Sequence, residues 1–121
     1  DHLIKHNISI IDLGPKKNIS VDYPDFAKKV ASRIKYKKSS VGILICGSGT
    51  GMAISANKTK EVRAAVCYNK SSTRLSRQHN NANIIALGSR LTKKKDILML
   101  ISLFLNTKFE GGRHLKRVKK I

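Results

Sequence analysis

Tryptophan is absent from this chain of 121 residues, and aromatic residues of all kinds make up only 5%. Proteins that bind single-stranded nucleic acid stack its bases on aromatic side chains, so this scarcity argues against that class. Two cysteines, Cys46 and Cys67, are too few for a disulfide framework. No apolar run reaches the roughly 18 residues that a membrane span needs, and the first residues lack the layout of a signal peptide. We therefore expect a cytoplasmic protein with no membrane partner.

Acidic residues are also scarce. The chain has 7 Asp and Glu against 25 Lys and Arg, which gives a net charge of +18. Such an excess attracts phosphate in some form. The basic residues are scattered along the chain, whereas nucleic-acid binders usually concentrate them on one helix or tail. A solvated basic surface is one interpretation and a phosphate-binding protein is the other, while a nucleic-acid partner is not expected.

The remaining composition, 40% apolar and 26% charged, is typical of a globular protein, and the length fits a single domain over residues 1–121. Strand and helix patterns alternate along it. Apolar strands without alternation predict a parallel sheet with helices on both faces, a Rossmann-like three-layer α/β/α fold with a basic C-terminal helix. The predicted strands are 8–12, 41–46, 62–67 and 83–87. The predicted helices are 24–34, 52–57, 71–79, 97–105 and 113–121.

A glycine-rich loop is the most informative local feature. Gly47, Gly49 and Gly51 lie at alternate positions between a buried strand and a helix, where backbone N–H groups can hold an anion or a developing oxyanion. The loop lacks the Gly-Lys-Ser/Thr ending of a Walker A motif. It also fails the dinucleotide fingerprint, because Met52 replaces the third glycine. An ordinary tight turn is the alternative.

Cys46 comes directly before this loop. It is either a small buried apolar residue or a thiolate made accessible and stabilised by the N–H groups of the helix that follows. Cys67 has no glycine loop after it, so we interpret it as structural. His79 precedes a strand and is either a surface or helix-capping residue or a functional one. Arg113 and Arg117 are four residues apart, and would form a phosphate clamp on one helix face or part of a solvated basic tail.

Six motifs, taken in order, closely resemble those of the type B ribose-5-phosphate isomerases. Together they run across nearly the whole chain, and the Glu-Gly-Gly-Arg-His segment resembles the ribose enzymes more than the related galactose-6-phosphate isomerase subunits. The motifs are Val21–Ala27, Ile43–Met52, Ala56–Lys58, Ser76–Asn83, Ala86–Arg90 and Phe109–Val118.

The resemblance implies an enzyme that interconverts ribose 5-phosphate and ribulose 5-phosphate in the pentose phosphate pathway, with no metal or organic cofactor. It implies that Cys46 is the base and that His79 assists opening of the sugar ring. Some members use a Glu on the loop as base, but that position is Met52 here. It also implies a homodimer or homotetramer with sites at the subunit interface. The substrate-binding residues that it implies are Gly47, Ser48, Gly49, Thr50, Gly51, Asn80, Arg90, Arg113 and Arg117.

The start of the chain departs from that family. Its members begin with a strand and an Asp-His-Ala-Gly-like turn, whereas Asp1 and His2 come only a few residues before the predicted strand 8–12. The resemblance therefore implies an N-terminally truncated domain, in which strand 8–12 lacks its usual partner and activity is weak or absent. A hexose-6-phosphate isomerase of the same family and an inactive subunit remain the alternatives.

Overall fold

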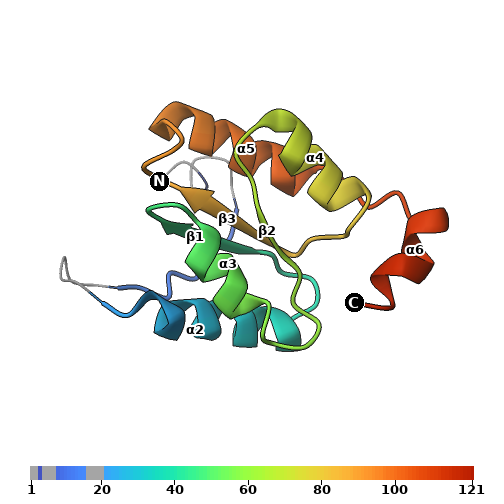
Figure 1. Cartoon of the computed structure of the whole chain (residues 1–121), viewed down its shortest axis with the longest axis horizontal. Coiled ribbons are helices and arrows are strands. Elements are labelled where there is room, and N and C mark those ends of the chain that lie inside the picture. Colours follow the sequence, from blue (N-terminus) through green and yellow to red (C-terminus); the bar gives the residue numbers. More distant parts are fainter. Residues whose placement is uncertain (1–2, 4–7, 16–20) are drawn as a thin grey trace.

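A parallel sheet between two layers of helices forms the core of the protein (Figure 1). The coordinates are a computed structural model, which describes residues 3, 8–15 and 21–121. In chain order, the helices and strands of the described residues are α2 Tyr23–Tyr36, β1 Gly42–Cys46, α3 Thr50–Ala56, β2 Ala64–Val66, α4 Lys70–Gln78, β3 Ile84–Gly88, α5 Lys94–Asn106 and α6 Arg113–Val118.

Strand β3 lies in the middle of the sheet and pairs in parallel with β1 on one side and β2 on the other. All five of its residues are buried. Because side chains alternate along a strand, Ile84 and Ala86 pack on the core cluster of α2 and α3, whereas Ile85 and Leu87 pack with α5. Coverage on both faces explains why the sequence of this strand is apolar without alternation.

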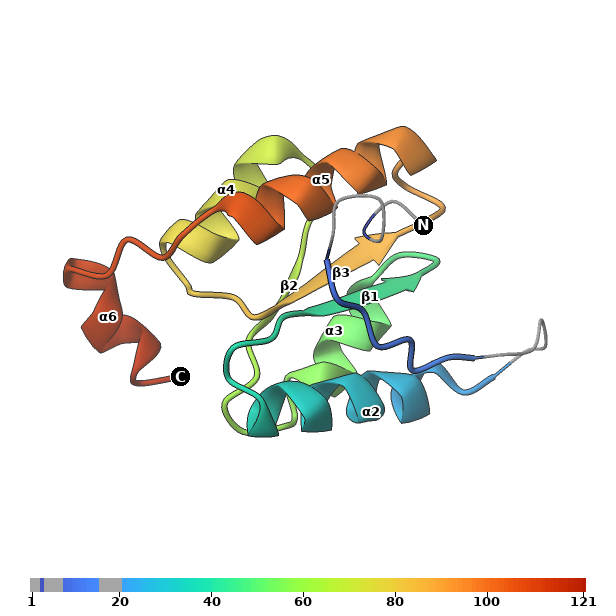
Figure 2. The same ribbon diagram turned by 180° about the vertical axis from the view of Figure 1, so that it is seen from behind.

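The helices divide between the two faces of the sheet. Figures 1 and 2 show α2 and α3 on one face and α4 and α5 on the other, while α6 projects from one end of the molecule. None of the described helices is long and apolar enough to cross a membrane. The predicted apolar face of α2 is confirmed, since its buried and half-buried members are Phe26, Ala27, Val30, Ala31 and Ile34.

Every predicted helix is present, although its bounds shift by a few residues. The helix predicted at 52–57 begins earlier, at Thr50, because Gly49 caps it in a left-handed conformation, with φ +80°. Helix α4 begins after Asn69, whose side chain accepts a hydrogen bond from the Ser72 amide at 2.7 Å. The basic C-terminal helix is α6.

The strand predicted at 8–12 is wrong. Residues 8–15 have no regular secondary structure, and the side chains of Ile8, Ile10 and Ile11 are exposed. A strand is stable only where a neighbouring strand satisfies its backbone donors and acceptors. Among the described residues β1 pairs with β3 alone, and no strand lies beside residues 8–12. The part of the sheet that is described therefore has three strands rather than the four expected.

Gly88, the last residue of β3, has no space for a side chain. A Cβ atom there would lie 2.7 Å from the carbonyl oxygen of Ser48. We expect Gly88→Ala to lower the free energy of unfolding by about 1–3 kcal/mol, as overpacking does in well-packed sites. Urea denaturation measures the loss, with Ser71→Ala on an exposed turn of α4 as the control. Equal denaturation midpoints for Gly88→Ala and the unsubstituted protein would contradict this prediction.

Candidate active site

The glycine loop leaves the sheet at the carboxyl ends of its strands, where sites in parallel sheets form. Cys46 lies opposite Gly88 in the register between β1 and β3. The amide of Ser89 donates a hydrogen bond to the Cys46 carbonyl at 2.7 Å, and the amide of Arg90 donates one to the Gly47 carbonyl at 3.0 Å. These bonds join the loop after β1 to the turn after β3, so that both segments form one edge of the fold.

Two glycines allow this close approach. Gly49 has φ +80°, a left-handed conformation that favours glycine, and a Cβ on it would lie 3.0 Å from the Leu87 backbone. Gly88 brings the opposite strand against Ser48, as described above. These two glycines therefore hold the loop between β1 and α3 against the end of β3.

The Cys46 thiol is half-buried and accepts a hydrogen bond from the Gly49 amide, with an N···S distance of 3.2 Å. A backbone N–H directed at sulfur favours negative charge on that atom. The Ser48 hydroxyl accepts a hydrogen bond from the Thr50 amide at 3.3 Å, beside the same loop. A nucleophilic or basic group and amide donors thus lie together at this edge.

Cys67 has a different environment. It is 1% exposed, and its Sγ lies 3.8 Å from the Ser76 hydroxyl. Burial raises the pKa of the Cys67 thiol, and its hydrogen bonding with the Ser76 and Thr73 side chains only partly opposes this rise. A buried thiol that resists ionisation suits the structural interpretation made from the sequence.

Arg90 adds a positive charge at the glycine-loop edge. Its guanidinium packs over Gly47, where an added Cβ would lie 3.3 Å from the Arg90 Nε. On the other side of the loop, the ring of Tyr23 packs on Gly51, where an added Cβ would lie 2.6 Å from the phenol oxygen. Tyr23 lies in one of the motifs singled out in the sequence but was not predicted to line the loop. No periodic signal marks it, because its contact depends on how α2 packs.

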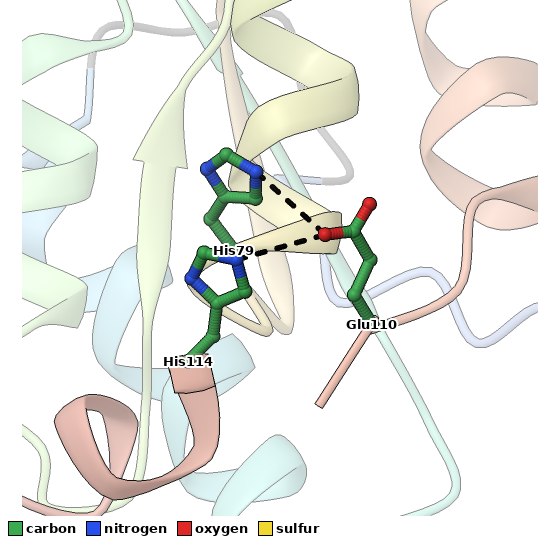
Figure 3. A group of neighbouring side chains, drawn as sticks. All are labelled: His79, Glu110 and His114. Carbon is green, nitrogen blue, oxygen red and sulfur yellow. Dashed lines mark ion pairs between the residues drawn. The ribbon is translucent and has the colours of Figure 1, made fainter. Parts of the chain in front are cut away.

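His79 belongs to a second group of polar side chains, shown in Figure 3 with Glu110 and His114. His79 is the C-cap residue of α4, which agrees with the interpretation of this residue as a helix-capping histidine. Its ring stacks on that of His114, with centroids 4.1 Å apart and planes at 13°. The Glu110 carboxylate lies 3.8 Å from the His79 Nε2 and 3.6 Å from the His114 Nε2. A backbone hydrogen bond from Glu110 to the Gln78 carbonyl, at 3.1 Å, fixes this segment beside the end of α4.

Glu110 and His114 were both missed by the sequence analysis. The signal available was their i,i+4 spacing across the start of α6, within the motif Phe109–Val118. That spacing predicts neighbouring side chains only if a helix turn is already assumed. Their position beside His79, more than thirty residues earlier in the chain, depends on the tertiary packing of α4 and could not be read from it.

The environment of His114 shifts its ionisation. Burial is the largest cause that lowers the pKa of His114, and the positive charges of His79 and Arg113 lower it further. The Glu110 carboxylate acts in the opposite direction without cancelling them. His114 is therefore held in its neutral form to lower pH than an exposed histidine.

The remaining predicted residues lie near this second group. Asn80 follows His79 on an exposed turn, and Asn81 takes the left-handed conformation, φ +48°, that was expected where α4 ends. Arg113 and Arg117 are exposed on α6, and both lie near enough to His114 to lower its pKa. The guanidinium groups of Arg113 and Arg117 thus lie near the second group of polar side chains, His79, Glu110 and His114.

One chain does not bring the two groups together. The glycine loop follows the C-terminal end of β1, which lies beside the C-terminal end of β3, whereas His79 comes before the N-terminal end of β3. Strand β3 has five residues, and at about 3.3 Å per residue it separates its two ends by about 13 Å. Figures 1 and 2 show α6 at the end of the sheet opposite the strand arrowheads. Cys46 and Arg90 therefore lie at one end, and His79, Asn80, Arg113 and Arg117 at the other.

Comparisons with known proteins agree with the resemblance. The family described as Ribose/Galactose Isomerase matches residues 1–121. Ribose-5-phosphate isomerase B of Escherichia coli is 41% identical over 120 residues, which cover 99% of this chain and 80% of the relative.

Two solved structures match the fold closely. Ribose-5-phosphate isomerase B of Clostridium thermocellum has a TM-score of 0.95 at 47% identity and covers 98% of this chain and 80% of that chain. The enzyme of Mycoplasma genitalium, solved with bound ribulose-5-phosphate, has a TM-score of 0.94 at 41% identity, with the same coverage. These matches confirm the predicted Rossmann-like α/β fold.

The lowered pKa of His114 predicts a pH dependence of stability. An unfolded histidine has a pKa of about 6.5, so the unfolded chain takes up this proton at higher pH than the folded chain does. The stabilisation is therefore complete above about pH 6.5 and is lost as pH falls through the lower, folded pKa. We expect the free energy of unfolding to fall over that range, and to fall less in His114→Gln. Urea denaturation at a series of pH values measures both, and identical slopes for the two proteins would contradict this origin.

Proposed function

Because the chain belongs to the ribose/galactose isomerase family and is an isomerase, we propose that it interconverts ribose 5-phosphate and ribulose 5-phosphate by proton transfer. The observation that carries the proposal is the hydrogen bond from the Gly49 amide to the Cys46 thiol, at 3.2 Å, on the glycine-rich loop. An aldose–ketose shift needs a base beside such donors, and no Asp or Glu occurs from Cys46 to Lys60.

In the proposed mechanism the Cys46 thiolate removes the proton from C2 of the open-chain aldose. The electron pair forms the C1–C2 double bond, and the carbonyl oxygen on C1 takes up the negative charge of the enediolate. Backbone amides of Gly47 to Gly51 would stabilise that oxygen, with Ser48 lining the pocket. The C2 hydroxyl gives its proton to the C1 oxygen, and return of the first proton from Cys46 to C1 gives the ketose, with its carbonyl at C2. No metal or organic cofactor takes part in these steps.

The second group would prepare and hold the substrate. His79 would protonate the ring oxygen as the furanose opens, and Asn80 would bind sugar hydroxyls. Arg113 and Arg117, both exposed and four residues apart on α6, would bind the phosphate together with Arg90. The large positive charge of the chain would favour the approach of such an anion.

The separation of the two groups supports a site shared between two copies of the chain. Because Cys46 lies beside the C-terminal end of β3 and His79 lies before its N-terminal end, a substrate a few carbon atoms long could reach both only if they come from different chains. We propose a homodimer or a homotetramer in which the glycine loop of one subunit faces His79, Arg113 and Arg117 of the other. A symmetric pair of this kind has two identical sites.

The ribulose-5-phosphate bound to the Mycoplasma genitalium enzyme supports a pentose substrate, and with it a place in the pentose phosphate pathway. A hexose 6-phosphate is the alternative, because the family description includes galactose. Comparing kcat/KM for the pentose and hexose phosphates decides between them. A base that must remain a free thiol suits the reducing cytoplasm, where we place the enzyme.

Replacing the base tests the chemistry. We expect Cys46→Ala to lower kcat by at least about a hundredfold, the scale of a general base, while the sugar phosphate still binds. Steady-state isomerase kinetics and a binding isotherm for ribulose 5-phosphate measure the two effects. The matched control is Cys67→Ala, which should keep kcat and cost about 1 kcal/mol of stability at most. Near-normal turnover in Cys46→Ala would place the base elsewhere.

Mixing two inactive variants tests the shared site. Cys46→Ala and His79→Asn should each lose most activity, but after unfolding and refolding together half of the dimers would be mixed. Each mixed dimer would have one site with both substitutions and one site with neither, so we expect about a quarter of the unsubstituted activity to return.

Refolding each variant alone is the control for this recovery. If the mixture is no more active than the separate variants, each site would have to be built within one chain, and the shared-site proposal would be wrong. If the unsubstituted protein itself lacks activity toward pentose and hexose phosphates, the chain would be the inactive subunit considered as an alternative.

A further inference from the structure

The group of His79, Glu110 and His114 has three donor atoms that face one another without forming hydrogen bonds. The Glu110 oxygen lies 3.8 Å from one histidine Nε2 and 3.6 Å from the other, which is beyond hydrogen-bond distance. All three donor atoms lie within 4.8 Å of one another. Figure 3 shows both rings presenting the same edge to the carboxylate.

We propose that His79, Glu110 and His114 bind a divalent transition-metal ion of the zinc class. Two imidazole nitrogens and one carboxylate form the donor set of open zinc sites, in which a fourth position is left for water or another ligand. No other group of three histidine, cysteine, aspartate or glutamate side chains within the described residues places its donor atoms this close together.

The spacing of the donors fits such an ion. Zinc–nitrogen distances near 2.0–2.1 Å place the ligands of a tetrahedral site about 3.3 Å apart. The two nitrogen–oxygen distances exceed this value by only 0.3–0.5 Å on that scale. Because the two rings are stacked with planes at 13°, both must also rotate until their nitrogen lone pairs converge on the ion. A hydrogen bond to the Gln78 carbonyl already fixes the backbone of Glu110 at the end of α4. Little of the chain would therefore have to become ordered when the ion binds.

The charges around the group set how tightly it would bind. Arg113 and Arg117 lie close enough to lower the pKa of His114, and their positive charge also opposes a bound cation. The Glu110 carboxylate offsets part of that repulsion. We therefore expect selective binding of zinc-class ions, which prefer imidazole ligands, and no binding of Mg²⁺.

The consequence of binding rests on the proposed function. A metal held by the His79 Nε2 would occupy the nitrogen that is proposed to assist ring opening. The ion would then be an inhibitor of the isomerase and not its cofactor. Use of ribose 5-phosphate should be inhibited more than use of ribulose 5-phosphate, which has no furanose ring to open.

Cobalt substitution tests the site independently of activity. On titration of the metal-free chain with Co²⁺, we expect visible d–d bands that saturate at one ion per chain, without a sulfur charge-transfer band, and that Zn²⁺ abolishes. Glu110→Gln and His114→Gln should each weaken binding at least tenfold, since loss of a direct ligand exceeds the tenfold or greater effect of second-shell changes. The double variant His2→Gln/His6→Gln removes the other two histidines of the chain and should bind as before.

Several results would overturn the proposal. Binding lost in the His2→Gln/His6→Gln variant, or a sulfur charge-transfer band that Cys46→Ala removes, would place the ion elsewhere. Unchanged affinity in His114→Gln would do the same. Cobalt bands with the expected variant pattern in a protein that lacks isomerase activity would uphold the metal site while the proposed function fails. Zinc inhibition that EDTA reverses, and that His114→Gln relieves, would support both.

Discussion

The register between β1 and β3 is the constraint on which the site depends. Cys46 lies opposite Gly88, and the missing side chain at Gly88 allows the Ser48 backbone to lie against the end of β3. A slip of one residue would place Leu87 or Ser89 beneath Ser48 and would exchange the two faces of β3. The buried side chains of β3 exclude that slip, because they pack alternately into the layers of α2 with α3 and of α5. The core therefore fixes the loop as well as the fold.

The same strand explains why the polar groups of the chain form two sets. Residues before β3 belong to one end of the sheet and residues after it to the other, and a buried strand cannot bend to bring its ends together. Hydrogen bonds hold each set locally: the Ser89 and Arg90 amides at the loop, and the Glu110 amide at the end of α4. These bonds hold each set in place within one chain, and the proposed association between two chains would bring the two sets together.

Much of the fold was predictable because apolar periodicity reports directly on burial. The spacing of Phe26, Val30 and Ile34 placed α2, and the unbroken apolar run at Ile84–Leu87 placed a strand covered on both faces. The strand expected at 8–12 was wrong, since an apolar alternation predicts a strand only if a partner lies beside it.

The glycine loop and the four-residue spacing of Arg113 and Arg117 were also visible as local patterns. The distances between segments that are far apart in the sequence could not be predicted from such patterns. That Glu110 and His114 lie beside His79 depends on how α6 follows α4 and α5 in space. That Cys46 lies far from all three depends on the direction of β3. Local patterns therefore predicted candidate site residues, while packing determined which of them lie together.

The two faces of helix α6 differ in burial. His114 points inward and is 7% exposed, whereas Arg113 and Arg117 on either side of it are open to solvent. The inward face attaches the helix to the end of α4, and the outward face carries cations that contribute no packing to the core. Substitutions at Arg113 or Arg117 can thus change the surface charge of α6 with little effect on the packing of the core. A substitution at His114 would instead remove the contacts with His79 and Glu110 that attach α6 to the end of α4.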